Sequence, residues 1–553
     1  MTSAEKITPH DSKRRYIFFP VHTSHHNITL TMSDPMKSKS ELLNTLKKLS
    51  FTSKEETPTI ENDIFSTLSY FKSLVNNESK TPSTPSPSSP YVLFYDDNEI
   101  TKYFKKLLLE SMTAQGSATL DEIRLLSHEI FTLILENSAI ADVLTTKSTI
   151  NDTNDTNGYT NDTNGKTLCA LISLSVGELR IELGRILSSN RDNRDVKCRR
   201  RQILIIWYCS RIVQSTMSIL IQLLEDKTAT QSAWNTLSMD TIINIRKLLD
   251  DAHDSMFQYL AQCSQCSYQR NQRNQLIAIL CIQCVGAWLS ESSIDDLTTS
   301  HKMVYDATCN SINFCHKITC EGEDEGDDTY DTDTDTSMIV IVATLSSEPL
   351  EYLLPALVHI SSQEKQKKKN NLLHRLSKEF PLQILIPYLN RVLETIKSND
   401  ESSCDHVKSL IWVFILLRKF KKSYKSMNYN NYNIRDTIIQ SVTILSTRLH
   451  QIITSNQSNS NKIINYSNSL RYAIQSWYLF HPLHHPQEYE IIKALQLFEK
   501  LILNQLLDGQ ALLLSNVILD YKKYRELSLQ YESYYELDLF MLQFESFVYT
   551  NAK

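Results

Sequence analysis

Apolar residues recur along most of this chain with the spacing of an amphipathic helix. Between positions 168 and 187 they stand three or four places apart, and Glu178, Arg180, Glu182 and Arg185 fall between them. A period near 3.6 residues places the apolar set on a buried face and the charged set on a solvated face. The same pattern runs through 203–224, 242–260, 276–289, 407–420, 434–453 and 489–507. The pattern predicts an all-α protein.

Polar segments interrupt the helical pattern. Positions 151–167 are rich in asparagine and threonine, and nine of the fifteen residues in 321–335 are acidic. Such segments have too few apolar residues to bury, and like charges repel one another. The domain organisation that follows is a disordered arm over 1–40, helical repeats over 41–150, 168–320 and 338–553, a low-complexity insert over 151–167 and an acidic loop over 321–337.

An internal repeat suggests how the helices are arranged. The pattern Pro349-Leu350-x-x-Leu353-Leu354-Pro355 recurs 32 residues later, beginning at Pro381. Proline suits the first turn of a helix, so both positions are predicted helix starts. A spacing near 32 residues suits a two-helix unit, close to the range of known helical repeats. The expected fold is a right-handed α-solenoid of armadillo/HEAT-like repeats with long disordered loop inserts.

Two residue types mark expected packing positions within this fold. Gly177 and Gly286 are expected to allow close approach of neighbouring helices, because glycine has no side chain. Trp207, Trp288 and Trp412 are expected to anchor the core between helices.

Glycine usage and charge narrow the function classes. The chain has only nine glycines in 553 residues, and none forms the G-x-G-x-x-G set of a dinucleotide-binding turn. Gly165-Lys166-Thr167 lacks the spacing of a phosphate loop, and the acidic loop lacks the glycine and glutamate of an EF-hand. The balance of 57 basic and 63 acidic residues argues against nucleic acid as the main partner. We therefore expect that this protein is not an enzyme and has no catalytic residue, cofactor or small-molecule substrate.

The first residues of the chain and the length of its apolar runs indicate the cellular compartment. Residues 1–15 lack the apolar stretch of a secretory signal, and the most apolar runs, 276–289 and 410–417, are shorter than a membrane span. The sequence therefore predicts a cytoplasmic protein with reduced thiols and no transmembrane segment.

Four cysteines form a metal-like pattern. Cys263 and Cys266 are followed by Cys281 and Cys284, with fourteen residues between the pairs. Four converging thiolates can bind zinc, usually from tight turns. Cys281 and Cys284 lie instead within an apolar helix pattern, where cysteine behaves as a small hydrophobe. We expect no metal site, and a zinc protein or metal-dependent helical enzyme that uses these four cysteines stays an alternative.

Several helical segments resemble the neurochondrin family. They are LCALISLSVGELRIELGRIL (168–187), the basic turn KCRRR with the apolar helix after it, QLIAILCIQCVGAWLSES (275–292) and EPLEYLLPALVHIS (348–361). The resemblance covers roughly 168–390, and the chain departs from it at 291–293, where a more acidic stretch is expected. The resemblance implies an armadillo-like fold and a cytosolic binding or regulatory protein without a catalytic site. In animals the family is associated with neurite outgrowth and with signalling and trafficking partners.

The expected function is a non-enzymatic scaffold or adaptor that presents a helical-repeat surface to other proteins in signalling or trafficking. An assembly chaperone for a large complex is the alternative within the same class.

Overall fold

The computed structural model describes residues 39–49, 58–78, 98–136, 163–188, 196–225, 237–265, 272–291, 308–309, 311–312, 349–363, 376, 380–398, 403–423 and 432–454, with isolated residues between 462 and 476. These residues are 96% helical and include no strand, so the all-α prediction is confirmed for this part of the chain. The predicted segment 489–507 lies outside it.

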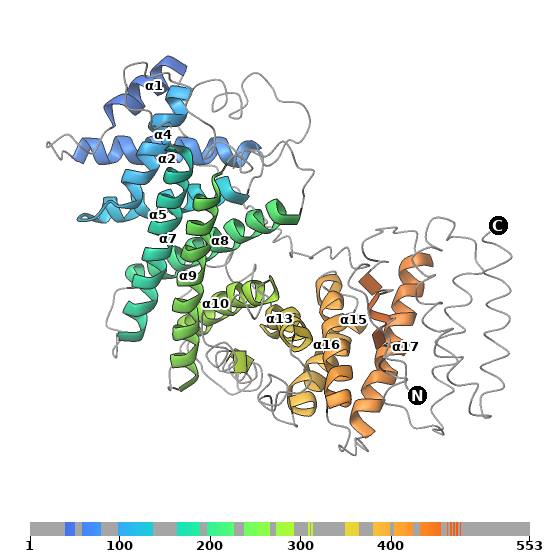
Figure 1. Cartoon of the computed structure of the whole chain (residues 1–553). Coiled ribbons are helices and arrows are strands. Elements are labelled where there is room, and N and C mark those ends of the chain that lie inside the picture. The colour runs from blue at the N-terminus through green and yellow to red at the C-terminus, as the bar shows by residue number, and fades with distance from the viewer. Residues whose placement is uncertain are drawn as a thin grey trace, which may run out of the picture.

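The helices follow one another from the N-terminal to the C-terminal end of the described part (Figure 1). Their bounds are α1 (Lys39–Lys48), α2 (Pro58–Glu78), α4 (Asn98–Met112), α5 (Ala118–Glu136), α7 (Thr163–Ser188), α8 (Val196–Glu225), α9 (Met239–Gln265), α10 (Gln272–Glu291), α13 (Leu350–Gln363), the π-helical turn η4 (Pro381–Leu385), α15 (Ile386–Ser398), α16 (Ser403–Ser423) and α17 (Tyr432–Thr454).

The apolar pattern located six of these helices correctly. The predicted segments 168–187, 203–224, 242–260, 276–289, 407–420 and 434–453 each lie inside an observed helix. The first of them extends further toward the N-terminus than predicted, because α7 begins at Thr163, inside the segment 151–167 that was expected to be an insert. Its first turn is polar and therefore leaves no apolar signal in the sequence. The rest of that insert, the arm before residue 39 and the acidic loop 321–337 lie outside the described residues.

The helices contact one another in two successions. In the first, which we call the A row, α2, α5, α8, α10, α13 and α16 each contact the next. In the second, the B row, contacts run from α1 to α4, α7 and α9, and again from α15 to α17. The rows are joined by contacts between α4 and α5, α7 and α8, α9 and α10, and α15 and α16. Each described helix thus packs mainly against its partner and against its neighbours in its own row.

The proline pattern marks where helices begin, but its 32-residue spacing is not the spacing between successive helices of one row. Pro349 immediately precedes α13, and Pro381 opens the η4 turn that continues into α15, as predicted. However, α13 belongs to the A row and α15 to the B row. The 32-residue offset therefore does not join equivalent helices, because it reports where two helices begin rather than which faces they share.

Small side chains let the A-row helices approach each other's backbone. Thr132 of α5 donates to the Tyr208 carbonyl of α8 at 3.4 Å, and the Cys284 thiol of α10 lies 3.6 Å from the Ser210 carbonyl. The Ser469 hydroxyl donates in the same way to the Val407 carbonyl of α16 at 2.7 Å. Hydrogen bonds of this kind satisfy carbonyl lone pairs and hold neighbouring helices in a fixed register.

Gly286 provides the closest approach among the described glycines. A Cβ atom built on Gly286 would lie 2.0 Å from the Tyr352 carbonyl oxygen of α13, so no side chain fits there. Gly177, in contrast, has nothing within 4 Å of its Cβ position. The packing prediction is therefore confirmed for Gly286 and wrong for Gly177, because no neighbouring helix reaches that side of α7.

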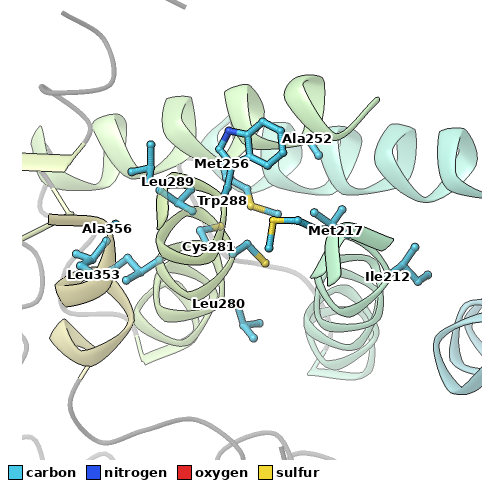
Figure 2. Packing of buried hydrophobic residues seen from close by; sticks show 14 of the residues in the cluster. Ile212, Met217, Ala252, Met256, Leu280, Cys281, Trp288, Leu289, Leu353 and Ala356 are labelled. Atoms are coloured by element: carbon cyan, nitrogen blue, oxygen red, sulfur yellow. The ribbon is translucent and has the colours of Figure 1, made fainter. Parts of the chain in front are cut away.

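Helix α10 lies at the centre of the core. Figure 2 shows α10 between α8 and α13, with Trp288 pointing toward Met256 and Ala252 of α9. The Trp288 ring is buried and stacks on His253, with ring centroids 4.5 Å apart. Trp207 and Trp412 are half-buried and pack against the core from its edge. The predicted anchoring role is confirmed for Trp288, whereas the other two keep one side open to solvent.

Candidate binding surface

Helices α10 and α16 of the A row expose less of their outward side than α7 and α9 of the B row. In the B row, side chains such as Arg180 and Ile181 of α7 and Lys247 and Asp251 of α9 are exposed. In the A row, no described side chain of α10 or α16 is exposed to that degree. The outward side chains of these helices are half-buried instead, so the A row presents a sheltered surface with polar and aromatic groups within reach of solvent.

We call this surface the A-row face. Its half-buried residues stand three or four positions apart on each helix, which places them in a stripe. Neighbouring helices occupy the remaining sides. The face consists of Trp207, Arg211, Gln214 and Ser218 of α8; Gln275, Ile279, Gln283 and Ala287 of α10; Tyr352, Pro355 and His359 of α13; and Lys408, Ile411, Trp412, Ile415, Arg418 and Lys419 of α16.

The α8 part of the face is held in place by an aromatic and ionic group. The Arg211 guanidinium lies 6.0 Å from the Trp207 ring centroid, and its Nε donates to Glu136 of α5 at 2.7 Å. A guanidinium over an indole is attracted to the ring and also restricts the motion of both side chains. This arrangement presents the Trp207 ring in a fixed orientation.

The α16 part of the face is positively charged. Lys408, Arg418 and Lys419 lie on the half-buried stripe of α16. The Lys419 ammonium donates to the Val358 carbonyl at 3.0 Å and to the Ser361 hydroxyl at 2.9 Å, both in the last turns of α13. A cation at this position satisfies carbonyls at a helix C-terminus and complements the helix dipole.

A buried carboxylate joins α13, α15 and α16 behind this part of the face. Glu351 Oε1 accepts a hydrogen bond from the Tyr388 hydroxyl at 2.8 Å, and His406 Nδ1 lies 2.5 Å from the same oxygen. The Ser409 hydroxyl lies 2.5 Å from the Tyr388 hydroxyl and donates to the His406 carbonyl. Glu351, Tyr388 and Ser409 are almost fully buried. We therefore assign this Glu351 cluster to helix packing, since a substrate could not reach the serine hydroxyl.

A second polar cluster lies between α5, α7 and α8. Arg124 lies within ion-pair distance of Asp121 at 3.4 Å and of Glu178 at 3.6 Å. The Gln202 amide donates to Glu182 at 2.7 Å. Burial is the main cause that raises the pKa of Glu178 above its usual value.

The charged side of α7 is thus less solvated than its sequence pattern predicts. Glu182 is only 4% exposed and Glu178 is half-buried, while Arg180 and Arg185 are exposed as predicted. The pattern was wrong for the two glutamates because α5 and α8 cover that part of the helix and supply Arg124 and Gln202 as partners.

The cysteine pattern falls within the helical core. Cys263 at the end of α9 and Cys281 and Cys284 within α10 are buried, and Cys266 lies outside the described residues. Burial raises the pKa of Cys281 well above its usual value and that of Cys284 to about 12, so both stay protonated thiols near neutral pH. In the described part of the chain, no three histidine, cysteine or acidic side chains are grouped so that they could hold a metal ion.

Two helices are long and apolar enough to cross a membrane by length and composition. They are Arg200–Ile221 in α8 and Asn274–Glu291 in α10. The prediction that every apolar run is too short was therefore wrong, because polar residues such as Gln283 shortened the runs in the sequence without ending the helix. In each helix, 61% of the apolar window is buried inside the protein. Core helices pass the same test, so length alone does not make either one a membrane span.

No known protein family matches the chain, and no curated protein is similar to it. The resemblance to the neurochondrin family therefore stays a prediction.

Proposed function

We propose that this chain is a non-enzymatic scaffold or adaptor of the neurochondrin type, built as a right-handed α-solenoid of armadillo/HEAT-like repeats. The observation that carries the proposal is the succession of contacts within the A row and within the B row. A stack in which each unit touches only its neighbours has a long continuous surface, and helical solenoids use such surfaces to bind other proteins.

The difference between the rows supports the A-row face as the binding side. In a curved stack of helix pairs, the inner row packs more closely than the outer one and its outward side is more sheltered. The A row has the close approach at Gly286 and the half-buried stripe on α8, α10, α13 and α16. We therefore place partner binding on the A-row face.

The cysteines support the proposed cytoplasmic location. No disulfide joins the seven cysteines whose side chains the structure describes, and Cys198 is exposed. Free exposed thiols persist in the reducing cytoplasm, whereas oxidising compartments favour disulfides.

Photocrosslinking at matched positions tests the proposed function. A benzophenone side chain replaces Gln283 on the A-row face in one protein and the exposed Gln258 on α9 of the B row in another. After irradiation in cells, we expect Gln283 to yield discrete protein adducts that Gln258 does not. Equal adduct patterns at both positions, or none at Gln283 while the protein keeps its helical circular dichroism, would contradict the proposal.

A further inference from the structure

The A-row face has a charge that the chain as a whole lacks. The whole sequence has a net charge of −6. Within 203–221, 275–290, 352–362 and 406–421, which form the face, there is no acidic residue at all. The same segments contain Arg211 of α8 and Lys408, Arg418, Lys419 and Lys421 of α16.

Two acidic residues border the face: Glu291 at the end of α10 is half-buried, and the exposed Glu136 of α5 accepts a hydrogen bond from Arg211. Glu351, just before the α13 segment, is 4% exposed and accepts hydrogen bonds within the Glu351 cluster. Asp240 and Asp251 of α9 and Glu394 of α15 are exposed, but they belong to the B row. Along α8, α10, α13 and α16 the face therefore has more cations than carboxylates, whereas exposed side chains of both signs lie on the B row, such as Arg180 and Asp251.

We propose that the A-row face binds an extended acidic segment of a partner protein, an inference that rests on the scaffold function proposed above. Complementary charge favours encounter with such a segment and disfavours basic ones. The aromatic rings of Trp207, Tyr352 and Trp412 provide contact area between the cations. Aromatic and arginine side chains are the residues that contribute most of the binding energy at protein interfaces.

The neutral middle of the face suits a polypeptide with both polar and apolar groups. Gln283 on α10 is half-buried, and its amide has both donors and an acceptor. A side-chain amide can therefore pair with the N–H and C=O groups of an extended chain that crosses the helices. Ala287, about one turn after Gln283, leaves room for that chain to approach α10. Ile279, about one turn before it, is half-buried and provides apolar contact area for a side chain of the segment.

The spacing of the helices sets the length of the segment. Packed helices lie about 8–10 Å apart, so α8 to α16 spans roughly 27 Å along the A row. An extended chain rises about 3.3 Å per residue. The bound segment is therefore about eight or nine residues long, with acidic side chains concentrated at the end that meets α16.

A nucleic acid fits the face less well. Its phosphates are evenly spaced, and each bound phosphate requires a nearby cation. The cations of the face lie on α16 and at Arg211, while the described parts of α10 and α13 in the face have none. An acidic peptide can place its charges where the cations are and its apolar residues over the rest.

The probes are two pools of labelled nine-residue peptides. One pool has glutamate at the positions of one end and leucine, valine, tyrosine or serine at the others, and the other pool has lysine in place of glutamate. Fluorescence anisotropy with the full chain measures binding of each pool and of a nine-nucleotide oligothymidine. We expect the glutamate pool to bind at least fivefold more tightly than both other probes, and the binding to weaken as salt rises.

Charge reversal on each row locates the binding. Lys408→Glu with Arg418→Glu changes the A-row face, and Arg180→Glu with Lys247→Glu makes the same charge change on the B row. We expect the first pair to weaken binding of the glutamate pool about fivefold or more, and the second pair less than twofold. Gln283→Glu, matched by Gln258→Glu on α9, repeats the comparison without touching a cation, in case the first pair disturbs folding.

The outcomes separate this inference from the scaffold function. If both pairs weaken binding equally, or if oligothymidine binds as tightly as the glutamate pool, the inference is overturned. If neither pool binds while the Gln283 photocrosslink still captures discrete proteins, the scaffold proposal survives and the acidic-segment inference does not. Selective loss with the A-row pair supports the inference.

Discussion

Replacing Gly286 with alanine tests the closest helix contact in the protein. The new Cβ would lie 2.0 Å from the Tyr352 carbonyl oxygen and 2.7 Å from its carbonyl carbon. Non-bonded carbon atoms are most stable about 3.5–4.0 Å apart, so α10 and α13 would have to separate by more than an ångström. The obstacle is backbone rather than the flexible end of a side chain, so a change of rotamer cannot relieve it.

The expected free-energy change combines two opposing effects. Alanine favours a helix over glycine by about 1 kcal/mol. Overpacking a well-packed contact costs about 1–3 kcal/mol, and this contact is tighter than most because the backbone itself must move. Movement of α10 also disturbs the packing of Trp288 and Met256. We therefore expect Gly286→Ala to be destabilised by about 2 kcal/mol or more.

Gly184 provides the matched control. It lies on α7, is exposed, and has nothing within 4 Å of its Cβ position. Gly184→Ala should therefore show the propensity effect alone, a stabilisation of about 0.5–1 kcal/mol. Urea unfolding followed by circular dichroism gives the midpoints, and hydrogen exchange of α10 and α13 localises the effect. If both alanine variants are equally stabilised, the close approach of α10 to Tyr352 is refuted.

Three further predictions concern the buried groups. Trp288→Ala should lower the free energy of unfolding by about 3–5 kcal/mol without changing which proteins crosslink at Gln283, and an unchanged urea midpoint would contradict its burial. Tyr388→Phe removes a donor to Glu351 and should cost about 1–3 kcal/mol, whereas Tyr472→Phe, in a half-buried tyrosine outside the Glu351 cluster, should cost less in the same urea titration. Burial lowers the pKa of His128 and His253 from 6.5 to about 4. Between pH 6.5 and pH 4 the unfolded chain therefore binds more protons, and stability should fall as the pH drops through this window, by on the order of 3 kcal/mol for each histidine. His253→Gln should reduce this loss of stability in thermal melts from pH 7 to pH 4. A melting temperature that falls with pH as steeply as in the wild type would refute the lowered pKa of His253.

Local periodicity was enough to locate the helices. The apolar spacing in 242–260 and 434–453 reports which side of a helix is buried, and this depends only on residues within a few turns. Prolines 349 and 381 marked helix starts for an equally local reason, since proline lacks the N–H that an interior turn requires. Fold class and helix positions could therefore be predicted from the sequence.

The candidate surface could not be predicted in this way. Whether an outward residue is exposed or sheltered depends on which helices pack beside it, and α8, α10, α13 and α16 are neighbours in space through contacts between distant parts of the chain. The sequence shows that each of these segments lacks acidic residues. Only the fold shows that the segments lie side by side in one row and together form a surface. The expectation that Trp207 and Trp412 lie in the core was wrong for the same reason. The sequence shows that a helix has an apolar side, but it does not show how far the neighbouring helix covers that side.

The sequence by itself determined an all-α chain, the positions of six helices though not all of their boundaries, and a composition poor in the glycines that phosphate-binding loops require. Tertiary structure alone decided that Glu182 is buried beside Gln202, that Gly286 rather than Gly177 meets a neighbouring backbone, and that Arg211 of α8 and the cations of α16 share one face. The physical reason is range. Helix formation and amphipathicity depend on residues three or four positions apart, whereas burial, pKa shifts and surface charge depend on residues that lie far apart in the sequence and meet only in the fold.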